Sequence, residues 1–328
     1  FPDSIGIQIN SNLSGEIPIE IGNLTDLEHI DLRGNELIGE IPSTIGDLQN
    51  LSSLNLSRNQ LSGEIPLELM NSLNLTGLLL SENQLSGEIP IEIGNLENLD
   101  VLDLNSNQLI GDIPYEIGDL DSLLWLSLSN NQLIGEIPIQ ITSLERVYLL
   151  DLSFNSLEGS IPNNIDNMNL SFLYLNSNEL TGSIPTEIGN LDNLAYLFLD
   201  NNELNGQIPA GFDNLELAYL TLNNNQLIGE IPDQFCNIYS VELSGNYFCP
   251  DYPSCITEQE LGFQDTFYCI ECAEISGDIN DDNGVDILDI ILTVNCVLIN
   301  GCDACSDINI DGEINILDII LMVNIIIE

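Results

Sequence analysis

Lysine is absent from this chain of 328 residues, and positive charge of any kind is scarce. The basic residues are Arg33, Arg58 and Arg146, and there is a single histidine, His29. Because 53 residues are acidic, the formal net charge is −50 at pH 7. Such a chain would repel the phosphates of nucleic acid and of anionic membrane surfaces, which excludes the first partner and disfavours the second. This number of carboxylates requires cations, either dissolved for screening or bound as ions. We therefore expect a salty or calcium-rich environment.

Cysteine is missing from the first 235 residues, and all eight cysteines follow: Cys236, Cys249, Cys255, Cys269, Cys272, Cys296, Cys302 and Cys305. An even number in one cluster predicts disulfides and an oxidising compartment. A membrane-spanning run is also lacking, since the apolar segments 287–299 and 316–327 are too short and contain Asp and Asn. The chain starts without methionine, as a processed protein would. We therefore expect a secreted, extracellular or cell-surface protein.

Six Asn-x-Ser/Thr sequons are candidate N-glycosylation sites, although a sequence this rich in Asn, Leu and Ser creates several by chance. They are Asn12, Asn23, Asn50, Asn55, Asn74 and Asn169.

A repeated segment of about 24 residues makes up most of the sequence. Each copy carries Asn-x-x-x-Gly-x-Ile-Pro or a close variant. The ten glycines of this motif are Gly15, Gly39, Gly63, Gly87, Gly111, Gly135, Gly159, Gly182, Gly206 and Gly229, spaced by 24 except for two steps of 23. A fixed period of this length indicates a solenoid, in which stacked coils share one continuous core.

The segment 51–69 illustrates one coil. Leu54 and Leu56 alternate as the inward side chains of a short strand, and Asn59 lies at a turn where its amide can bond to backbone groups of neighbouring coils. Gly63 and Pro66 interrupt the return path on the convex side. These residues closely resemble plant-type leucine-rich repeats. The resemblance implies an α/β solenoid over residues 1–248, a right-handed coil with a concave parallel sheet and short 3₁₀ segments behind it.

Two outward columns of the concave sheet place apolar side chains together on repeats six to ten. We call this group the concave apolar band: Trp125, Leu149, Phe172, Tyr174, Tyr196, Phe198 and Tyr219. Contiguous exposed apolar groups mark interaction sites, so the band is a candidate surface for a protein or a glycan. The alternative is a cross-strand ladder that only stabilises the sheet.

In each of the first six coils a carboxylate follows the repeat glycine. We call this the acidic column: Glu16, Glu40, Glu64, Glu88, Asp112 and Glu136. A solvated acidic face is the favoured interpretation, and bound divalent ions are the alternative. Carboxylate pairs such as Asp103 with Asp151, or with Glu242, could perform glycosidase chemistry, but 53 acidic residues guarantee such pairs. We therefore do not expect an enzyme.

Residues 249–276 form a cysteine-rich cap and linker at the end of the repeats. Cys236, Cys249, Cys255 and Cys269 are expected to form two disulfides, for which three pairings exist. The pairs Cys269-x-x-Cys272 and Cys302-x-x-Cys305 also have the spacing of a zinc site. Disulfides are preferred because the compartment is extracellular and Cys296 would be left over.

Residues 277–328 contain two loops with oxygen side chains at calcium-binding spacing, each completed by a backbone carbonyl. The predicted ligands are Asp278, Asn280, Asp282, Gly284, Asp286 and Asp289, then Asp307, Asn309, Asp311, Glu313, Asn315 and Asp318. An apolar helix pattern follows each loop. These duplicated loop–helix units resemble dockerin type I modules, which implies a small all-α domain with two Ca²⁺ ions and a cohesin-like partner. At the positions that select cohesins this chain has the aliphatic pairs 287–288 and 316–317, and the alternative is a calcium-stabilised cap without a partner.

The sequence therefore predicts a non-catalytic, calcium-dependent, extracellular recognition, adhesion or assembly protein. It would bind a protein or glycan on the concave face and a partner through the dockerin-like module. The alternative is a structural subunit that polymerises head to tail. The sequence enters directly inside a repeat, so the C-terminal module of one copy could cover the open first coil of the next and propagate a filament.

Overall fold

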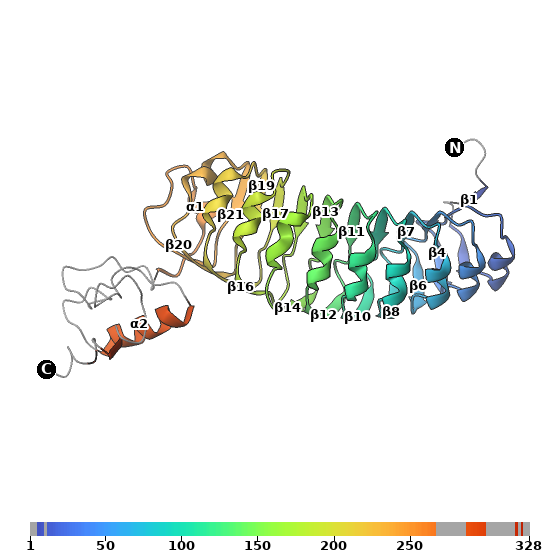
Figure 1. Cartoon of the computed structure of the whole chain (residues 1–328), viewed down its shortest axis with the longest axis horizontal. Coiled ribbons are helices and arrows are strands. Elements are labelled where there is room, and N and C mark those ends of the chain that lie inside the picture. Colours follow the sequence, from blue (N-terminus) through green and yellow to red (C-terminus); the bar gives the residue numbers. More distant parts are fainter. Residues whose placement is uncertain (1–4, 10–11, 267–286, 300–318, 321–322, 324–328) are drawn as a thin grey trace.

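A computed structural model describes residues 5–9, 12–266, 287–299, 319–320 and 323 of the chain. The repeat region is a single row of stacked coils (Figure 1). Each complete coil contributes a strand to one sheet, a second strand to another sheet, and a five-residue 3₁₀ helix. The solenoid predicted from the 24-residue period is therefore confirmed.

The first sheet has eleven parallel strands, one from each coil in sequence order. Its outward columns are in the predicted register, since Trp125 pairs with Leu149 and Leu149 with Phe172. The central residue of each strand points inward, as buried Leu126 and Leu150 do. The strands are β1 (Gly6–Gln8), β3 (His29–Asp31), β5 (Ser53–Asn55), β7 (Gly77–Leu79), β9 (Val101–Asp103), β11 (Trp125–Ser127), β13 (Leu149–Asp151), β15 (Phe172–Tyr174), β17 (Tyr196–Phe198), β19 (Tyr219–Thr221) and β21 (Ser240–Glu242).

A second row of parallel strands, which the sequence analysis did not anticipate, follows the asparagine turns. Seven strands form one sheet: β2 (Ser14–Glu16), β4 (Glu36–Gly39), β6 (Gln60–Gly63), β8 (Gln84–Glu88), β10 (Gln108–Asp112), β12 (Gln132–Glu136) and β14 (Ser156–Glu158). Four more form another: β16 (Thr181–Ser183), β18 (Glu203–Gln207), β20 (Gln226–Gly229) and β22 (Tyr247–Phe248). The row breaks between β14 and β16, where the glycine spacing drops from 24 to 23.

A 3₁₀ helix closes each coil and begins directly after the repeat proline. The proline fixes its own φ near −65° and so favours a helical start at that point. The ten helices are η1 (Ile19–Asn23), η2 (Ser43–Asp47), η3 (Leu67–Asn71), η4 (Ile91–Asn95), η5 (Tyr115–Asp119), η6 (Ile139–Ser143), η7 (Asn163–Asn167), η8 (Thr186–Asn190), η9 (Ala210–Asn214) and η10 (Asp233–Asn237). Neighbouring helices approach closely at glycine: a Cβ on Gly118 would lie 2.5 Å from the Gln140 carbonyl oxygen.

The turn asparagine binds one coil to the next, as the sequence predicted for Asn59. Its Nδ2 donates to the carbonyls of Leu32 and Leu56 at 3.0 and 2.9 Å, and its Oδ1 accepts from the Leu37 amide at 3.1 Å. Backbone groups that the sheets leave unpaired inside the solenoid are thereby satisfied, which avoids a large desolvation cost.

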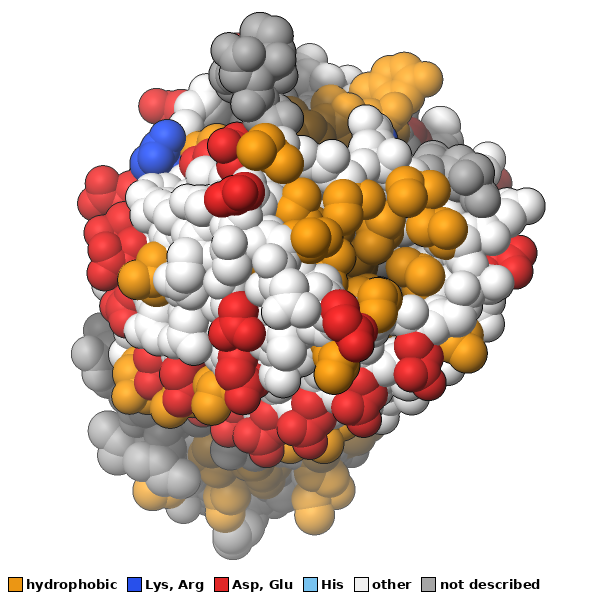
Figure 2. All heavy atoms as spheres, turned by 90° about the vertical axis from the view of Figure 1, so that its right-hand side faces the viewer, with side chains coloured by type: hydrophobic (Ala, Val, Ile, Leu, Met, Phe, Trp, Pro, Cys, Tyr) orange, Lys and Arg blue, Asp and Glu red, His pale blue; other side chains and the backbone are white. Residues whose placement is uncertain are grey.

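Apolar side chains gather on the end of the solenoid nearest the N terminus (Figure 2). Ile5 and Ile9, which flank the edge strand β1, are 53% and 36% exposed, while Ile7 packs against the core. The predicted head-to-tail contact at this end stays a prediction.

The other end of the solenoid carries a cap. Cys236 and Cys255 form a disulfide with a Cα–Cα distance of 5.5 Å, which is one of the pairings left open above, and Cys249 is disulfide-bonded as well. The short helix α1 (Glu258–Leu261) begins at Thr257 with a capping box. The Thr257 amide and hydroxyl donate to the Glu260 carboxylate and lower its pKa.

The segment after the first predicted calcium loop is helical, as expected, and forms α2 (Ile287–Ile299). Of the predicted calcium ligands, Asp289 lies in this helix, and all the others lie outside the described residues. Cys296 also lies in α2, whereas Cys269, Cys272, Cys302 and Cys305 lie outside the described residues. The calcium sites and the remaining disulfides therefore stay predictions.

Candidate functional site

The concave apolar band lies on β11 to β19, with all seven side chains half-buried. Its aromatic rings pack against one another along the sheet. The ring centroids of Phe172 and Tyr196 are 4.7 Å apart and those of Tyr196 and Tyr219 are 5.0 Å apart, both in stacked geometry. In the neighbouring column, Tyr174 and Phe198 meet edge to face at 5.0 Å. The cross-strand ladder therefore exists, and each ring still presents part of its surface to solvent.

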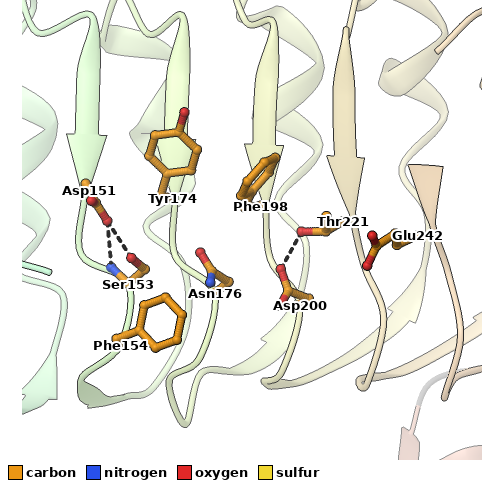
Figure 3. Close-up of a pocket in the computed structure, with 9 residues that line it drawn as sticks. All are labelled: Asp151, Ser153, Phe154, Tyr174, Asn176, Phe198, Asp200, Thr221 and Glu242. Carbon is orange, nitrogen blue, oxygen red and sulfur yellow. Dashed lines mark hydrogen bonds between the residues drawn. The ribbon is translucent and has the colours of Figure 1, made fainter. Parts of the chain in front are cut away.

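Tyr174 and Phe198 of the band also line an open hollow of about 480 Å³, which Figure 3 shows. We call it the acidic hollow. Its walls come from the last residues of the concave strands and the turns that follow: Asp151, Ser153, Phe154, Tyr174, Asn176, Phe198, Asp200, Thr221 and Glu242. The chain brings these residues together because each successive coil adds one strand end to the same column.

Three carboxylates border the acidic hollow, and neutral groups hold two of them in place (Figure 3). Asp151 Oδ1 accepts from the amide of Ser153 at 3.1 Å and from its hydroxyl at 2.6 Å. Asp200 accepts from the Thr221 hydroxyl and from Asn201 Nδ2. Glu242, on the last concave strand, is exposed and accepts no side-chain hydrogen bond from the described residues.

The Tyr174 hydroxyl stays protonated in this setting. Burial raises the pKa of Tyr174, and the nearby Asp151 carboxylate raises it further because a second negative charge there is unfavourable. At neutral pH the phenol is therefore a neutral hydrogen-bond donor beside a carboxylate.

Phe154 is a site residue that the sequence analysis missed. It stands at a turn position where the chain adopts a left-handed conformation, with φ of 54°, and other coils use Ser106, Asn130 or Ser177 there. A bulky residue in this region is strained, and Phe154 is nonetheless 56% exposed. The available signal was the comparison of equivalent turn positions between repeats, which singles out one phenylalanine.

Two buried polar atoms near the band have no hydrogen-bond partner among the described residues. One is Nε1 of Trp125, and the other is Oδ1 of Asn223. Asn223 lies two residues beyond Thr221, as Asp200 lies two beyond Phe198, so it occupies the equivalent turn position one coil later, outside the lining of the acidic hollow.

A second hollow of about 460 Å³ adjoins the first at Glu242, which lines both. We call it the cap hollow. Its lining residues are Ser240, Val241, Glu242, Ser244, Thr257, Gln259 and Glu260. The two hollows together make an extended polar and aromatic surface from β13 to α1.

The acidic column is exposed on the second sheet, and the choice between a solvated face and bound divalent ions stays a prediction. All six carboxylate residues are exposed, and each side chain leans over the glycine of the next coil, so that a Cβ on Gly111 would lie 3.0 Å from Glu88 Cγ. Within the described part of the chain no group of three or more His, Cys, Asp or Glu residues could hold a metal ion. Asp103 is almost buried and accepts from Asn105, which ties it to the turn.

The sequons differ in their accessibility. Asn55 is half-buried on the concave strand β5, where its Oδ1 accepts from the Ser57 amide. The other five sequon asparagines are exposed. Glycosylation at any of them stays a prediction.

The fold defines a repeat protein with a concave parallel sheet. The family model described as Leucine Rich Repeat matches residues 26–48, 50–72, 74–96, 98–120, 122–144, 146–168, 169–191, 193–215 and 216–238. The chain belongs to the leucine-rich-repeat family. No curated protein matches the chain.

Solved structures give a closer view of the similarity. A structure described as a TDR receptor matches with a TM-score of 0.72 and 32% identity, covering 79% of this chain and 46% of that one. The Arabidopsis receptor kinase HAESA, in complex with the peptide hormone IDA and the co-receptor SERK1, matches with a TM-score of 0.62 and 36% identity, covering 73% and 45%. A plant ice-binding protein matches with a TM-score of 0.65 and 30% identity, covering 76% and 81%. The chain thus spans less than half the length of these two receptors.

None of the described helices is long and apolar enough to cross a membrane.

Proposed function

We propose that this protein is a non-catalytic, extracellular recognition protein that binds a peptide segment of a partner along the concave face of repeats six to ten. The observation that carries the proposal is the joining of the concave apolar band to two adjoining hollows on one continuous surface. Leucine-rich-repeat receptors such as HAESA are solved with a bound peptide hormone, which supports the ligand class. An extended peptide suits a surface that crosses the ends of several strands, because its side chains can enter successive hollows.

The concave apolar band can bind a ligand and also stabilise the sheet, so the experiment must separate these two roles. Displayed random peptides are first selected on the wild-type protein. The selected peptides are then titrated against the double variant Tyr174→Ser, Phe198→Ser. We expect at least a tenfold loss of affinity, because two half-exposed rings are removed from the binding face. The matched control is Tyr115→Ser on η5, a tyrosine that is 62% exposed but far from the concave sheet in the coil.

The melting temperature of each variant decides between the two interpretations. Binding lost with little change in melting temperature supports recognition by the band. A large fall in melting temperature with binding intact would show that the rings only stabilise the sheet and would contradict the proposal.

Trp125 extends the test to the N-terminal edge of the band. Trp125→Ser should weaken the titrated binding of the selected peptides, because it removes another half-buried ring from the binding face.

The C-terminal segment 277–328 is the basis for three further parts of the proposal. These are calcium dependence, a cohesin-like partner and a filament. The supporting evidence is the duplicated ligand spacing in the sequence and the helix α2 that follows the first loop. We propose that this segment binds two Ca²⁺ ions and mediates assembly, either with a partner or with another copy of the chain.

Ice binding is a second candidate, favoured by one observation. The plant ice-binding protein is covered over 81% of its length by this chain, while the two receptors are covered over less than half. Measurement of thermal hysteresis and of ice recrystallisation tests it directly, and an inactive protein at millimolar concentration would remove the candidate.

A further inference from the structure

We infer that the acidic hollow is a subsite for an arginine side chain of the bound peptide, so that this protein selects positively charged segments. The inference rests on the proposed function, because it specifies what one part of the concave face recognises.

The charge of the hollow is unbalanced. Asp151, Asp200 and Glu242 come from three different coils, and none of the three arginines of the chain lines the hollow. The hydrogen bonds that the first two carboxylates accept come from hydroxyl and amide groups, which are neutral. These bonds fix the side-chain positions without neutralising them, so the negative charge is available to a ligand.

The aromatic walls favour a cation over any neutral ligand. Tyr174 and Phe198 stand between Asp151 and Asp200 in Figure 3, and their rings contact each other edge to face. A cation over an aromatic face is attracted by the negative potential of the ring, and the attraction grows as the cation is desolvated. The exposed ring of Phe154 adds a third aromatic surface at the lower edge of the hollow.

A guanidinium fits this set of groups better than an ammonium. It is planar, so it can lie flat on a ring while its N–H groups donate to carboxylates at the rim. Glu242 connects the hollow to the cap hollow, so a chain that places arginine in the first can continue over Ser240 and Thr257 in the second.

The experiment uses two acetylated, amidated pentapeptides, Ser-Gly-Arg-Gly-Ser and the same sequence with citrulline in place of arginine. Citrulline has nearly the shape of arginine without its charge, so the ratio of the two dissociation constants isolates the cationic contribution. Ligand-detected NMR titration of the full chain is done at 150 mM salt to suppress the diffuse field of the protein. We expect the arginine peptide to bind about tenfold more tightly than the citrulline peptide.

Two charge-matched double variants locate the effect. Asp200→Asn with Glu242→Gln removes two charges from the hollow, and Glu64→Gln with Glu88→Gln removes two from the acidic column. The arginine preference should fall to less than about threefold in the first and remain in the second. Glu242→Gln alone serves if the double variant does not fold, because that side chain is exposed and accepts no hydrogen bond from the described residues.

Equal binding of the two peptides by the wild-type protein would overturn the inference, as would failure of both to bind. An equal loss in both double variants would also overturn it, because binding would then reflect net charge alone. None of these results would decide the proposed function, which is judged by the selected peptides and the aromatic variants.

Discussion

At the scale of single residues, the turn asparagine joins neighbouring coils through its side chain. Asn107 repeats the geometry of Asn59: its Nδ2 donates to the carbonyls of Leu80 and Leu104, and its Oδ1 accepts from the Leu85 amide. One buried side chain therefore satisfies three backbone groups from three segments of chain. Only a short amide offers two donors and an acceptor in this space, which explains why the position is asparagine in coil after coil.

We expect Asn107→Ala to lower the free energy of unfolding by about 3 kcal/mol, since three backbone groups lose their partner inside the solenoid. Chemical denaturation followed by circular dichroism measures the change. The control is Gln108→Ala, the exposed neighbouring residue at the start of β10, which should change stability by less than about 0.5 kcal/mol. Similar effects of the two substitutions would show that the asparagine bonds contribute little.

At the scale of structural elements, the C-terminal end of the solenoid is closed by a cap instead of another coil. The amide of Leu243 donates to the carbonyl of Glu260 in α1, so cap residues pair with the chain just after the last concave strand, β21. Gln264 donates to the carbonyls of Leu243 and Leu261, and Tyr252 donates to the carbonyl of Phe248. The cap thereby covers an edge that would otherwise be open to pairing with another chain.

The Cys236–Cys255 disulfide fastens this cap across a sequence separation of 19 residues. Cross-linking a loop of this length stabilises a fold by about 3 kcal/mol in the chain-entropy account. We expect the Cys236→Ser, Cys255→Ser variant to show weakened protection of backbone amides in coils nine and ten by hydrogen exchange, with coils two to five unchanged. Uniform loss of protection along the whole solenoid would contradict a local role.

At the scale of the whole molecule, the net charge is −50, and the carboxylates are arranged in two different ways. The acidic column is spread along the second sheet, exposed and without a metal cluster among the described residues, whereas the acidic hollow concentrates carboxylates beside aromatic rings. Self-repulsion of this size opposes compact folding and association, and salt or bound cations relieve it. Stability and assembly should therefore both depend on cations.

Calcium titration of the full chain by calorimetry should show two bound ions, because two loops carry complete ligand sets in the sequence. We expect Asp278→Ala and Asp307→Ala each to remove one ion, while Glu64→Ala with Glu88→Ala leaves both. Light scattering with and without chelator then shows whether calcium loading produces larger assemblies. Absence of calcium uptake would contradict the proposed sites, and calcium-loaded monomers at high concentration would contradict the filament.

Much of this architecture could be predicted from the sequence, and the reason is its periodicity. A strict repeat places Leu54 and its equivalents at the same point of every coil, so the inward columns and the register of Trp125 with Leu149 and Phe172 follow from counting residues. Side chains two apart in a strand share a face, so the concave apolar band was also predictable. The second sheet was not, since its pairing depends on how closely the coils stack at the glycine turns.

The tertiary structure alone decided how the concave surface is shaped. The alternation of side chains along a strand predicts that Tyr174 and Phe198 point outward. Only the packing between strands makes them half-buried and brings their rings together edge to face. The acidic hollow depends on curvature and on turn residues such as Phe154 and Asp200, which lie beyond the strands and outside any period-two pattern. Repetition determines which residues are neighbours along the solenoid. The depth of the surface between them depends on side-chain packing in three dimensions.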